Sequence, residues 1–99
     1  MSPSDADGSI VGICDIAAHT EQVLRNLLTA LAAAGAGPEH VVKWNVLVTD
    51  GQDFAAGYAA FQRVWGDRPN PPLITAAVVK GLAHPDFLVE MDAIAVVPV

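Results

Sequence analysis

Two carboxylates near the end of the chain have the type and spacing that acid–base chemistry requires. Glu90 and Asp92 are two residues apart in an alternating stretch, 87–97. Residues two apart on a strand point to the same face, so both carboxylates are expected on one face. A glutamate in a partly desolvated cleft can pass a proton to or from an attacking water. The alternative is that both carboxylates are hydrogen-bonded structural groups or lie at a solvent-exposed rim.

The other reactive side chains are isolated from one another. His19, His40 and His84 have no carboxylate or cysteine companions at ligand spacing, so no metal site is predicted. His84 is expected in a turn before the last strand, from which it could approach a cleft. The single Cys14 is more often a small buried hydrophobe than a nucleophile. We interpret Arg68 as a solvated loop residue, although it could also supply charge to a cleft.

The composition indicates a folded protein that needs a partner of its own kind. Of the 99 residues, 53% are hydrophobic and 16% are charged, with a net charge of -6. A domain this short cannot bury all of that apolar surface by itself, which favours a subunit interface. The five basic residues are scattered, which argues against nucleic-acid binding. The lack of a membrane-length apolar stretch or a signal peptide, together with the single cysteine, predicts a cytoplasmic protein.

Periodicity along the chain predicts one domain, 1–99, that alternates strands and helices. Residues 1–9 are expected to form a loose tail. Asp15 is a plausible N-cap for the first helix, and Gly35 is placed to end it. The other predicted elements are strands at 10–13, 41–49, 73–79 and 87–97, and a second helix at about 53–65.

The same pattern predicts which faces are buried. In the second helix Phe54, Tyr58, Phe61 and Trp65 form an aromatic stripe, most simply the core between helix and sheet; Tyr58 could alternatively turn its hydroxyl to a ligand. The strand 73–79 is apolar on both faces, which is typical of a strand buried on both sides. Right-handed crossovers place both helices on one side of the sheet. The other side then needs a partner, which is a second argument for an oligomer.

Taken in order, these segments resemble the reactive intermediate deaminase family, also called the RidA/YjgF family. The resemblance covers about 8–98 and is carried by AAAGAGPEHVVKWNVLVTD, DFAAGYAAFQRVWGD, the Pro71–Pro72 pair and LVEMDAIAVVP. It implies an α/β (α+β), chorismate-mutase-like fold in a homotrimer, with two helices on one face of a mixed sheet. In the family the sheets form a central barrel, and ligand clefts lie between subunits. Active members hydrolyse enamines or imines to ammonia and a 2-keto acid, without metal or organic cofactor.

The resemblance also assigns site residues one by one. The family's catalytic glutamate matches Glu90, whereas its pocket arginine corresponds to Ile74. Its cysteine corresponds to Ala76, and the asparagine of its second helix corresponds to Tyr58. The first strand pair of the family, with its Ser-Gly-Gln segment, would precede Met1. The predicted site is therefore catalytic Glu90 with substrate-binding Tyr58, Ile74, Thr75, Ala76 and Asp92.

The replacement of the arginine shapes the predicted function. A guanidinium gives a carboxylate both charge and orientation, and Ile74 gives neither. The sequence therefore predicts a homotrimer that binds a small metabolite in clefts between subunits and lacks standard deaminase activity. One alternative is an enamine or imine deaminase that acts through Glu90 with a different anchor. A third hypothesis is a trimer whose clefts are filled by side chains and that acts through partners.

Overall fold

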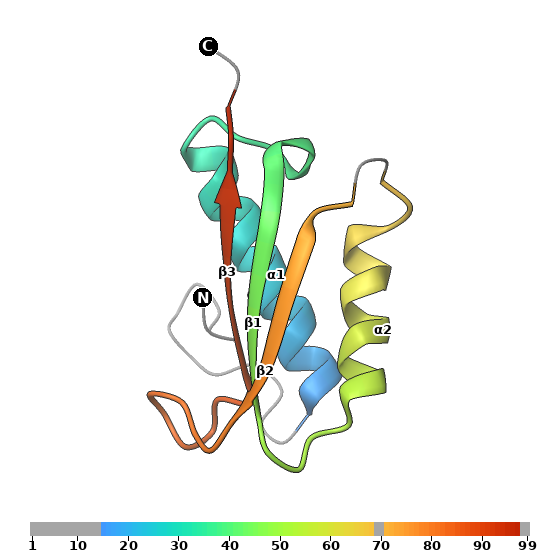
Figure 1. Cartoon of the computed structure of the whole chain (residues 1–99), viewed down its shortest axis with the longest axis vertical. Helices are drawn as coiled ribbons and strands as arrows, with labels where there is room; N and C mark the ends of the chain where they lie inside the picture. Colours follow the sequence, from blue (N-terminus) through green and yellow to red (C-terminus); the bar gives the residue numbers. More distant parts are fainter. Residues whose placement is uncertain (1–14, 69–70, 98–99) are drawn as a thin grey trace.

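The computed structural model describes residues 15–68 and 71–97. They form two helices, α1 (Ile16–Ala33) and α2 (Phe54–Trp65), a short 3-10 turn at Pro38–His40, and three strands. The strands are β1 (Val41–Thr49), β2 (Leu73–Val79) and β3 (Val89–Ala95). The sheet order is β2-β1-β3, with β1 parallel to β2 and antiparallel to β3 (Figure 1). The predicted mixed sheet with two helices is confirmed.

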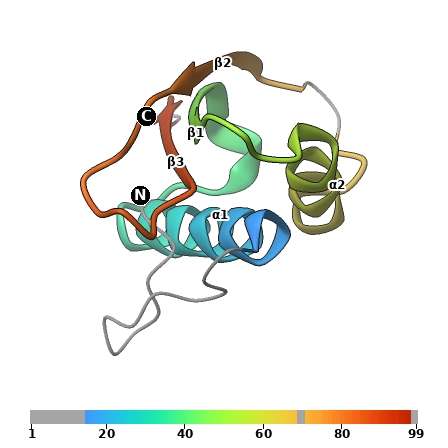
Figure 2. The ribbon, with the colours of Figure 1, turned by 90° about the horizontal axis from the view of Figure 1, so that it is seen from below.

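Both helices lie on one side of the sheet, as predicted (Figure 2). The side chain of Asp15 caps α1 by accepting a hydrogen bond from the Ala18 amide at 3.1 Å, and Asp53 caps α2 in the same way through Ala56. Each cap satisfies an amide that the first helical turn leaves without a partner. Gly35, at φ 80°, follows the end of α1 in a left-handed conformation that suits glycine.

The core is the contact between α1, β1 and β3, with the end of α2 beside it. Trp44 of β1 is fully buried and makes edge-to-face contacts with Phe61 at 5.9 Å and Trp65 at 5.3 Å between ring centroids. Such aromatic pairs contribute about 0.5–1.5 kcal/mol beyond their buried area. The prediction that the aromatic stripe is core is confirmed for Phe61 and Trp65. It is wrong for Phe54 and Tyr58, which are half exposed because α2 stands away from the sheet over a hollow.

An irregularity at the start of β1 changes which of its residues are buried. The pairing with β3 shifts between Val41 and Lys43, as a β-bulge does. Val41 is consequently buried together with Trp44, and Val42 is exposed. Strict alternation over 41–49 would put Val42, Trp44, Val46 and Val48 on one face, and this prediction is wrong for Val42 because of the bulge. The bounds predicted for the strand, 41–49, are confirmed.

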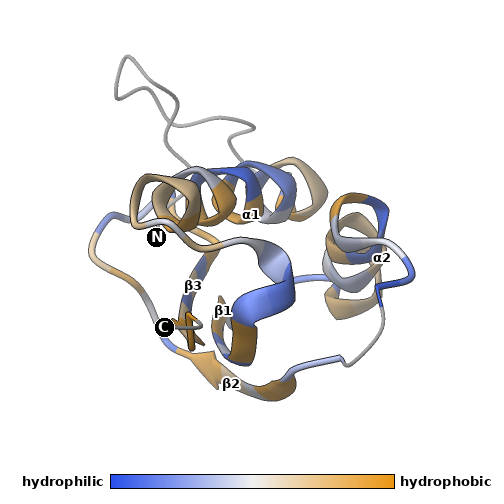
Figure 3. Cartoon of the chain, turned by 90° about the horizontal axis from the view of Figure 1, so that it is seen from above, coloured by the Kyte–Doolittle hydropathy of each residue, from blue (hydrophilic) through white to orange (hydrophobic). Residues whose placement is uncertain are grey.

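β2 differs most from its prediction. It is an edge strand, and nearly all its residues are exposed, including Leu73, Ile74 and Val78. Its expected burial on both faces is therefore wrong for a single chain, because β1 pairs with only one of its edges and the helices leave it largely uncovered. Figure 3 shows that this exposed strand is strongly hydrophobic. β3 is shorter than predicted, at Val89–Ala95 rather than 87–97.

The sheet face turned away from the helices, here called the open face, follows from the strand registers. It carries Lys43, Asn45 and Leu47 of β1, Leu73, Thr75 and Ala77 of β2, and Glu90, Asp92 and Ile94 of β3. The β3 residues that alternate with these three point to the helix side: Val89 and Met91 belong to the core, and Ala93 packs against it. The prediction of a helix-free sheet face is confirmed. The predicted tail 1–9, the strand 10–13 and Cys14 lie outside the described residues.

Candidate functional site

The two carboxylates singled out in the sequence lie together on the open face. Asp92 is exposed, and its Oδ1 accepts a hydrogen bond from the Asn45 side-chain amide at 2.7 Å. Glu90 is half-buried and lies opposite Leu47 in the register. Thr75 lies opposite Asn45 on the other side of β1. This face therefore offers one tethered carboxylate, one half-buried glutamate and a hydroxyl in adjacent rows.

The other predicted site residues lie on the helix side of the sheet. Tyr58, Ile74 and Ala76 line a hollow of about 140 Å³ between α2 and the sheet, together with Phe54, Phe61 and Val46. Thr20 is a polar residue beside it, and its hydroxyl donates to the Ile16 carbonyl at 2.8 Å. The Tyr58 hydroxyl accepts from the Gln62 side chain at 3.3 Å. The lining of the hollow is therefore mostly apolar, which favours contact with hydrocarbon groups.

The predicted site is consequently divided within one chain. Ile74 pairs with Trp44 on the helix side, whereas Glu90 pairs with Leu47 on the open face. The sheet itself separates the two groups, so a single chain does not bring Glu90 to Ile74, Ala76 or Tyr58. The residue types and their spacing identify these positions one at a time and do not show that they lie on opposite faces of the sheet.

A second groove continues from the hollow toward the start of β2. It shares Tyr58, Phe61 and Ile74 with the hollow and adds Trp65 and Arg68. The Arg68 guanidinium lies 5.3 Å from the centroid of the Trp65 ring, a distance typical of a cation–π contact. Arg68 is exposed, as predicted, but it is stacked on an aromatic ring beside the hollow. In the sequence, only the three-residue spacing of Trp65 and Arg68 points to this contact.

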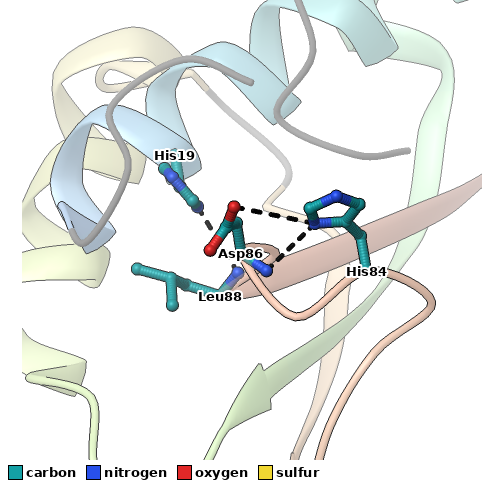
Figure 4. A network of polar contacts seen from close by, with 4 residues as sticks. All are labelled: His19, His84, Asp86 and Leu88. Carbon is teal, nitrogen blue, oxygen red and sulfur yellow. Dashed lines mark hydrogen bonds and ion pairs between the residues drawn. The ribbon is translucent and has the colours of Figure 1, made fainter. Parts of the chain in front are cut away.

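Each of the three histidines accepts a hydrogen bond from a backbone amide. The buried His19 accepts a hydrogen bond from the Leu88 amide at 3.4 Å, which ties α1 to the entry of β3. His84 accepts from the Asp86 amide at 3.0 Å, and its Nδ1 lies 3.9 Å from the Asp86 carboxylate (Figure 4). His40 accepts a hydrogen bond from the Gly37 amide at 2.9 Å.

Within 15–68 and 71–97, no three histidine, cysteine or acidic residues gather as metal ligands would. In the same ranges, no helix is both long and apolar enough to cross a bilayer.

Comparisons with known proteins agree on one family. The family model described as Endoribonuclease L-PSP matches residues 1–97. A RutC family protein of Synechocystis is 38% identical over 90 residues, which are 91% of this chain and 68% of the relative. Protein DfrA of Myxococcus xanthus is 37% identical over 83% of this chain and 60% of its own length. The chain thus spans about 60–68% of these curated relatives.

Solved structures share the fold. YyfB of Yersinia pestis, a protein of the conserved Rid family, superposes with a TM-score of 0.83 at 30% identity, over 97% of this chain and 73% of that one. Escherichia coli TdcF, solved with bound serine, superposes with a TM-score of 0.86 at 25% identity, over 98% and 76% of the two chains. The arrangement of α1, α2 and the three strands is therefore one that crystal structures of this family contain.

Proposed function

Because the chain belongs to the RidA/YjgF family, described by its model as Endoribonuclease L-PSP, we propose that it is a homotrimeric small-metabolite-binding protein. Its ligand clefts lie between subunits, and it has little or no standard deaminase activity. The observation that carries this proposal is the division of the site. Glu90 faces away from Ile74 and Tyr58 within one chain, so only a neighbouring chain can complete a cleft that contains them all.

The exposed apolar residues support assembly through the sheet. Leu73 is 74% exposed and Ile94 is 52% exposed on the open face, although both are strongly hydrophobic. Large exposed apolar side chains of this kind favour an interaction surface, and Lys43 lies between the two in the register. Covering the open face by identical chains buries this surface and keeps the polar sides of α1 and α2 in water.

The position of Ile74 supports the loss of standard deaminase activity. Its side chain lines the hollow where the resemblance implies a carboxylate-binding arginine. An apolar side chain there removes both the charge and the paired donors that hold an amino-acid-derived anion. The alternative, a deaminase that acts through Glu90, is supported by the glutamate itself, which is half-buried on the open face.

Small molecules fit this chain better than nucleic acid. It carries five Lys and Arg residues against eleven Asp and Glu residues, with a net charge of -6. A phosphate backbone is repelled by such a surface, so we do not extend the nuclease activity named by the family model to this chain.

A cytoplasmic location is part of the same proposal. The serine bound to TdcF belongs to that protein, and it supports a small polar metabolite as the general class of ligand.

Light scattering coupled to size exclusion tests the assembly. We expect a mass of about three times 10.3 kDa at micromolar concentration. A stable single chain of 10.3 kDa would overturn the proposal.

A cross-link tests the shared cleft. In a Cys14→Ser background, cysteines at positions 74 and 90 should be joined between chains by a short bis-maleimide. Cysteines at 33 and 90 serve as the control, which should stay uncoupled. Linkage of 74 to 90 within single chains only would contradict the shared cleft.

An assay separates the proposal from its enzymatic alternative. Freshly generated 2-aminoacrylate is offered to the protein, and keto-acid release is followed by a coupled dehydrogenase. We expect no release above the buffer rate. Robust release that is lost on Glu90→Gln would establish the deaminase instead.

A further inference from the structure

A histidine inside the core holds the residue that leads into β3. His19 of α1 is fully buried, and its Nδ1 accepts a hydrogen bond from the Leu88 amide at 3.4 Å. The Leu88 carbonyl accepts from the Thr49 amide at 2.9 Å and from the Thr49 hydroxyl at 3.3 Å. Leu88 is therefore tied to α1 through its N–H group and to β1 through its carbonyl. Because β3 begins at Val89 and Glu90 follows, these bonds also fix where the Glu90 backbone enters the sheet.

The acceptor in the contact with α1 is one that a proton removes. A neutral imidazole has one nitrogen that accepts and one that donates, whereas a protonated imidazole only donates. Protonation of His19 at Nδ1 would replace the attraction to the Leu88 amide by two donors that face each other. It would also place a charge in the interior, which is costly unless the charge is paired. The contact therefore requires the neutral imidazole.

The charged groups around His19 show which of them can respond to its protonation. The segment before β3 supplies His84 and Asp86, which lie around the same contact (Figure 4). The charged side chains of α1 with its cap, of α2 and of β3 are exposed, ion-paired or on the open face: Asp15, Glu21, Arg25, Arg63, Glu90 and Asp92. Among 15–68 and 71–97, the local balance of charge thus depends on His84 and Asp86.

His84 responds to acid in the opposite way. Its Nδ1 accepts from the Asp86 amide at 3.0 Å and lies 3.9 Å from the Asp86 carboxylate. Both side chains are about half exposed, so a protonated His84 can exchange the amide for an ion pair with that carboxylate. Acid therefore preserves the hold of His84 on the segment and engages Asp86 with it. The contact that acid breaks is the one made by His19.

From these contacts we propose that His19 is a positioning residue for the candidate site and makes the entry of β3 sensitive to pH. At neutral pH the uncharged imidazole holds Leu88, and through it Glu90, in place. At mildly acidic pH protonation of His19 releases the segment 84–88 from α1. This inference rests on the proposed function only for the part that Glu90 plays in the cleft, because the contact itself lies within one chain.

The size of the effect follows from the linkage between protonation and opening. The closed segment requires a neutral imidazole, whereas an exposed histidine has a pKa of about 6.5. Opening therefore binds a proton, and its equilibrium constant rises as the pH falls through that value. From about pH 7.5 to about pH 5.5 the opening constant increases about tenfold.

Hydrogen exchange of single amides in the full chain, followed by NMR, measures this opening. Each rate is compared with that of an unstructured amide at the same pH, which gives a protection factor. We expect the Leu88 and Thr49 amides to lose about tenfold in protection between the two pH values. The Asp50 amide donates to the Val79 carbonyl at 3.0 Å and should keep its protection as an internal control. Unchanged protection of Leu88 and Thr49 would overturn the inference.

Matched asparagine variants identify the histidine responsible. Nδ1 of His19, His40 and His84 each accepts from a backbone amide, and asparagine offers an oxygen there that does not titrate. His19→Asn should remove the pH dependence, and His19→Leu, which has no acceptor, should lower protection at both pH values. His40→Asn and His84→Asn should retain the tenfold change. A change that survives His19→Asn or disappears in His84→Asn would overturn the inference, and the second comparison stands even if no variant at position 19 folds.

The oligomeric state of each sample separates this inference from the proposed function. A single chain that opens in acid through His19 would refute the trimer and support the positioning role. A trimer whose Leu88 protection does not depend on pH would refute the positioning role and leave the assembly standing.

Discussion

A charge placed at the centre of the open face should prevent assembly. Leu47 lies in the middle strand, between Ala77 and Glu90 in the register, and is 36% exposed. Leu47→Asp removes an apolar group from the proposed interface and sets a second carboxylate beside Glu90. In a free chain the new carboxylate lies on the uncovered open face, so the substitution acts mainly on the assembled state.

The size of the effect follows from burial and charge. Complete burial of a leucine contributes about 1.5–3 kcal/mol, so covering the exposed third of Leu47 contributes roughly 0.5–1 kcal/mol in each chain. An unpaired carboxylate taken out of water costs several kcal/mol more. Three copies together lose at least about 5 kcal/mol of assembly free energy, which exceeds a thousandfold in the equilibrium constant, since about 1.4 kcal/mol is tenfold.

Sedimentation velocity at micromolar concentration measures this change. We expect Leu47→Asp to sediment as a single chain with an unchanged far-ultraviolet circular dichroism spectrum. Ala55→Asp is the matched control, since it adds the same charge at an exposed position in the first turn of α2, and it should assemble as the unsubstituted protein does. If Leu47→Asp stays trimeric with undiminished affinity, the open face is not the interface and the reasoning fails.

Three further predictions concern the site and the core. Ile74→Arg should raise keto-acid release from 2-aminoacrylate at least about tenfold, by restoring a carboxylate anchor, and Glu90→Gln in the same chain should abolish the gain; no gain would argue against the role given to Ile74. Trp44→Ala should lower the free energy of unfolding by about 3–5 kcal/mol in urea titrations, because it empties a fully buried site; an unchanged midpoint would contradict its place in the core. Asp15→Ala should cost about 1 kcal/mol in thermal unfolding, whereas Asp15→Asn should cost much less, because asparagine retains a capping oxygen.

Local patterns were enough to predict most of the elements. The predicted cap at Asp15 and the glycine at Gly35 gave the limits of the first helix, and the aromatic spacing gave those of the second, within a residue or two. The alternation from Val41 to Thr49 fixed the central strand. These signals succeed because caps and periodicity depend on residues a few positions apart.

Features that depend on distant residues were not predictable in the same way. The bulge that exposes Val42 exists only in the pairing of β1 with β3. The exposure of β2 depends on its position at the sheet edge, although its own composition is that of a buried strand. The hollow that Phe54 and Tyr58 line depends on how α2 packs against the sheet, which the aromatic spacing does not encode.

The arrangement of the candidate site was also not predictable from local sequence patterns. Each residue was assigned correctly to its element, and parity along β2 already separates Ile74 from Thr75. Whether Ile74 shares a face with Glu90 depends on two strand registers, one on each side of β1. Only those registers show that the two residues lie on opposite sides of the sheet.

In the proposed trimer, this division would link ligand binding to assembly. A sheet is one layer thick, so Glu90 of one chain reaches a ligand beside Ile74 only if that ligand lies against a second chain. A ligand held by two chains binds the assembled state and not the free chain, and it stabilises assembly by about 2.7 kcal/mol at a hundredfold excess over its dissociation constant. Raising either the ligand concentration or the subunit concentration would therefore favour the trimer. In the proposed trimer, burial of the exposed Ile94 and Leu73 would then serve ligand binding as well as stability.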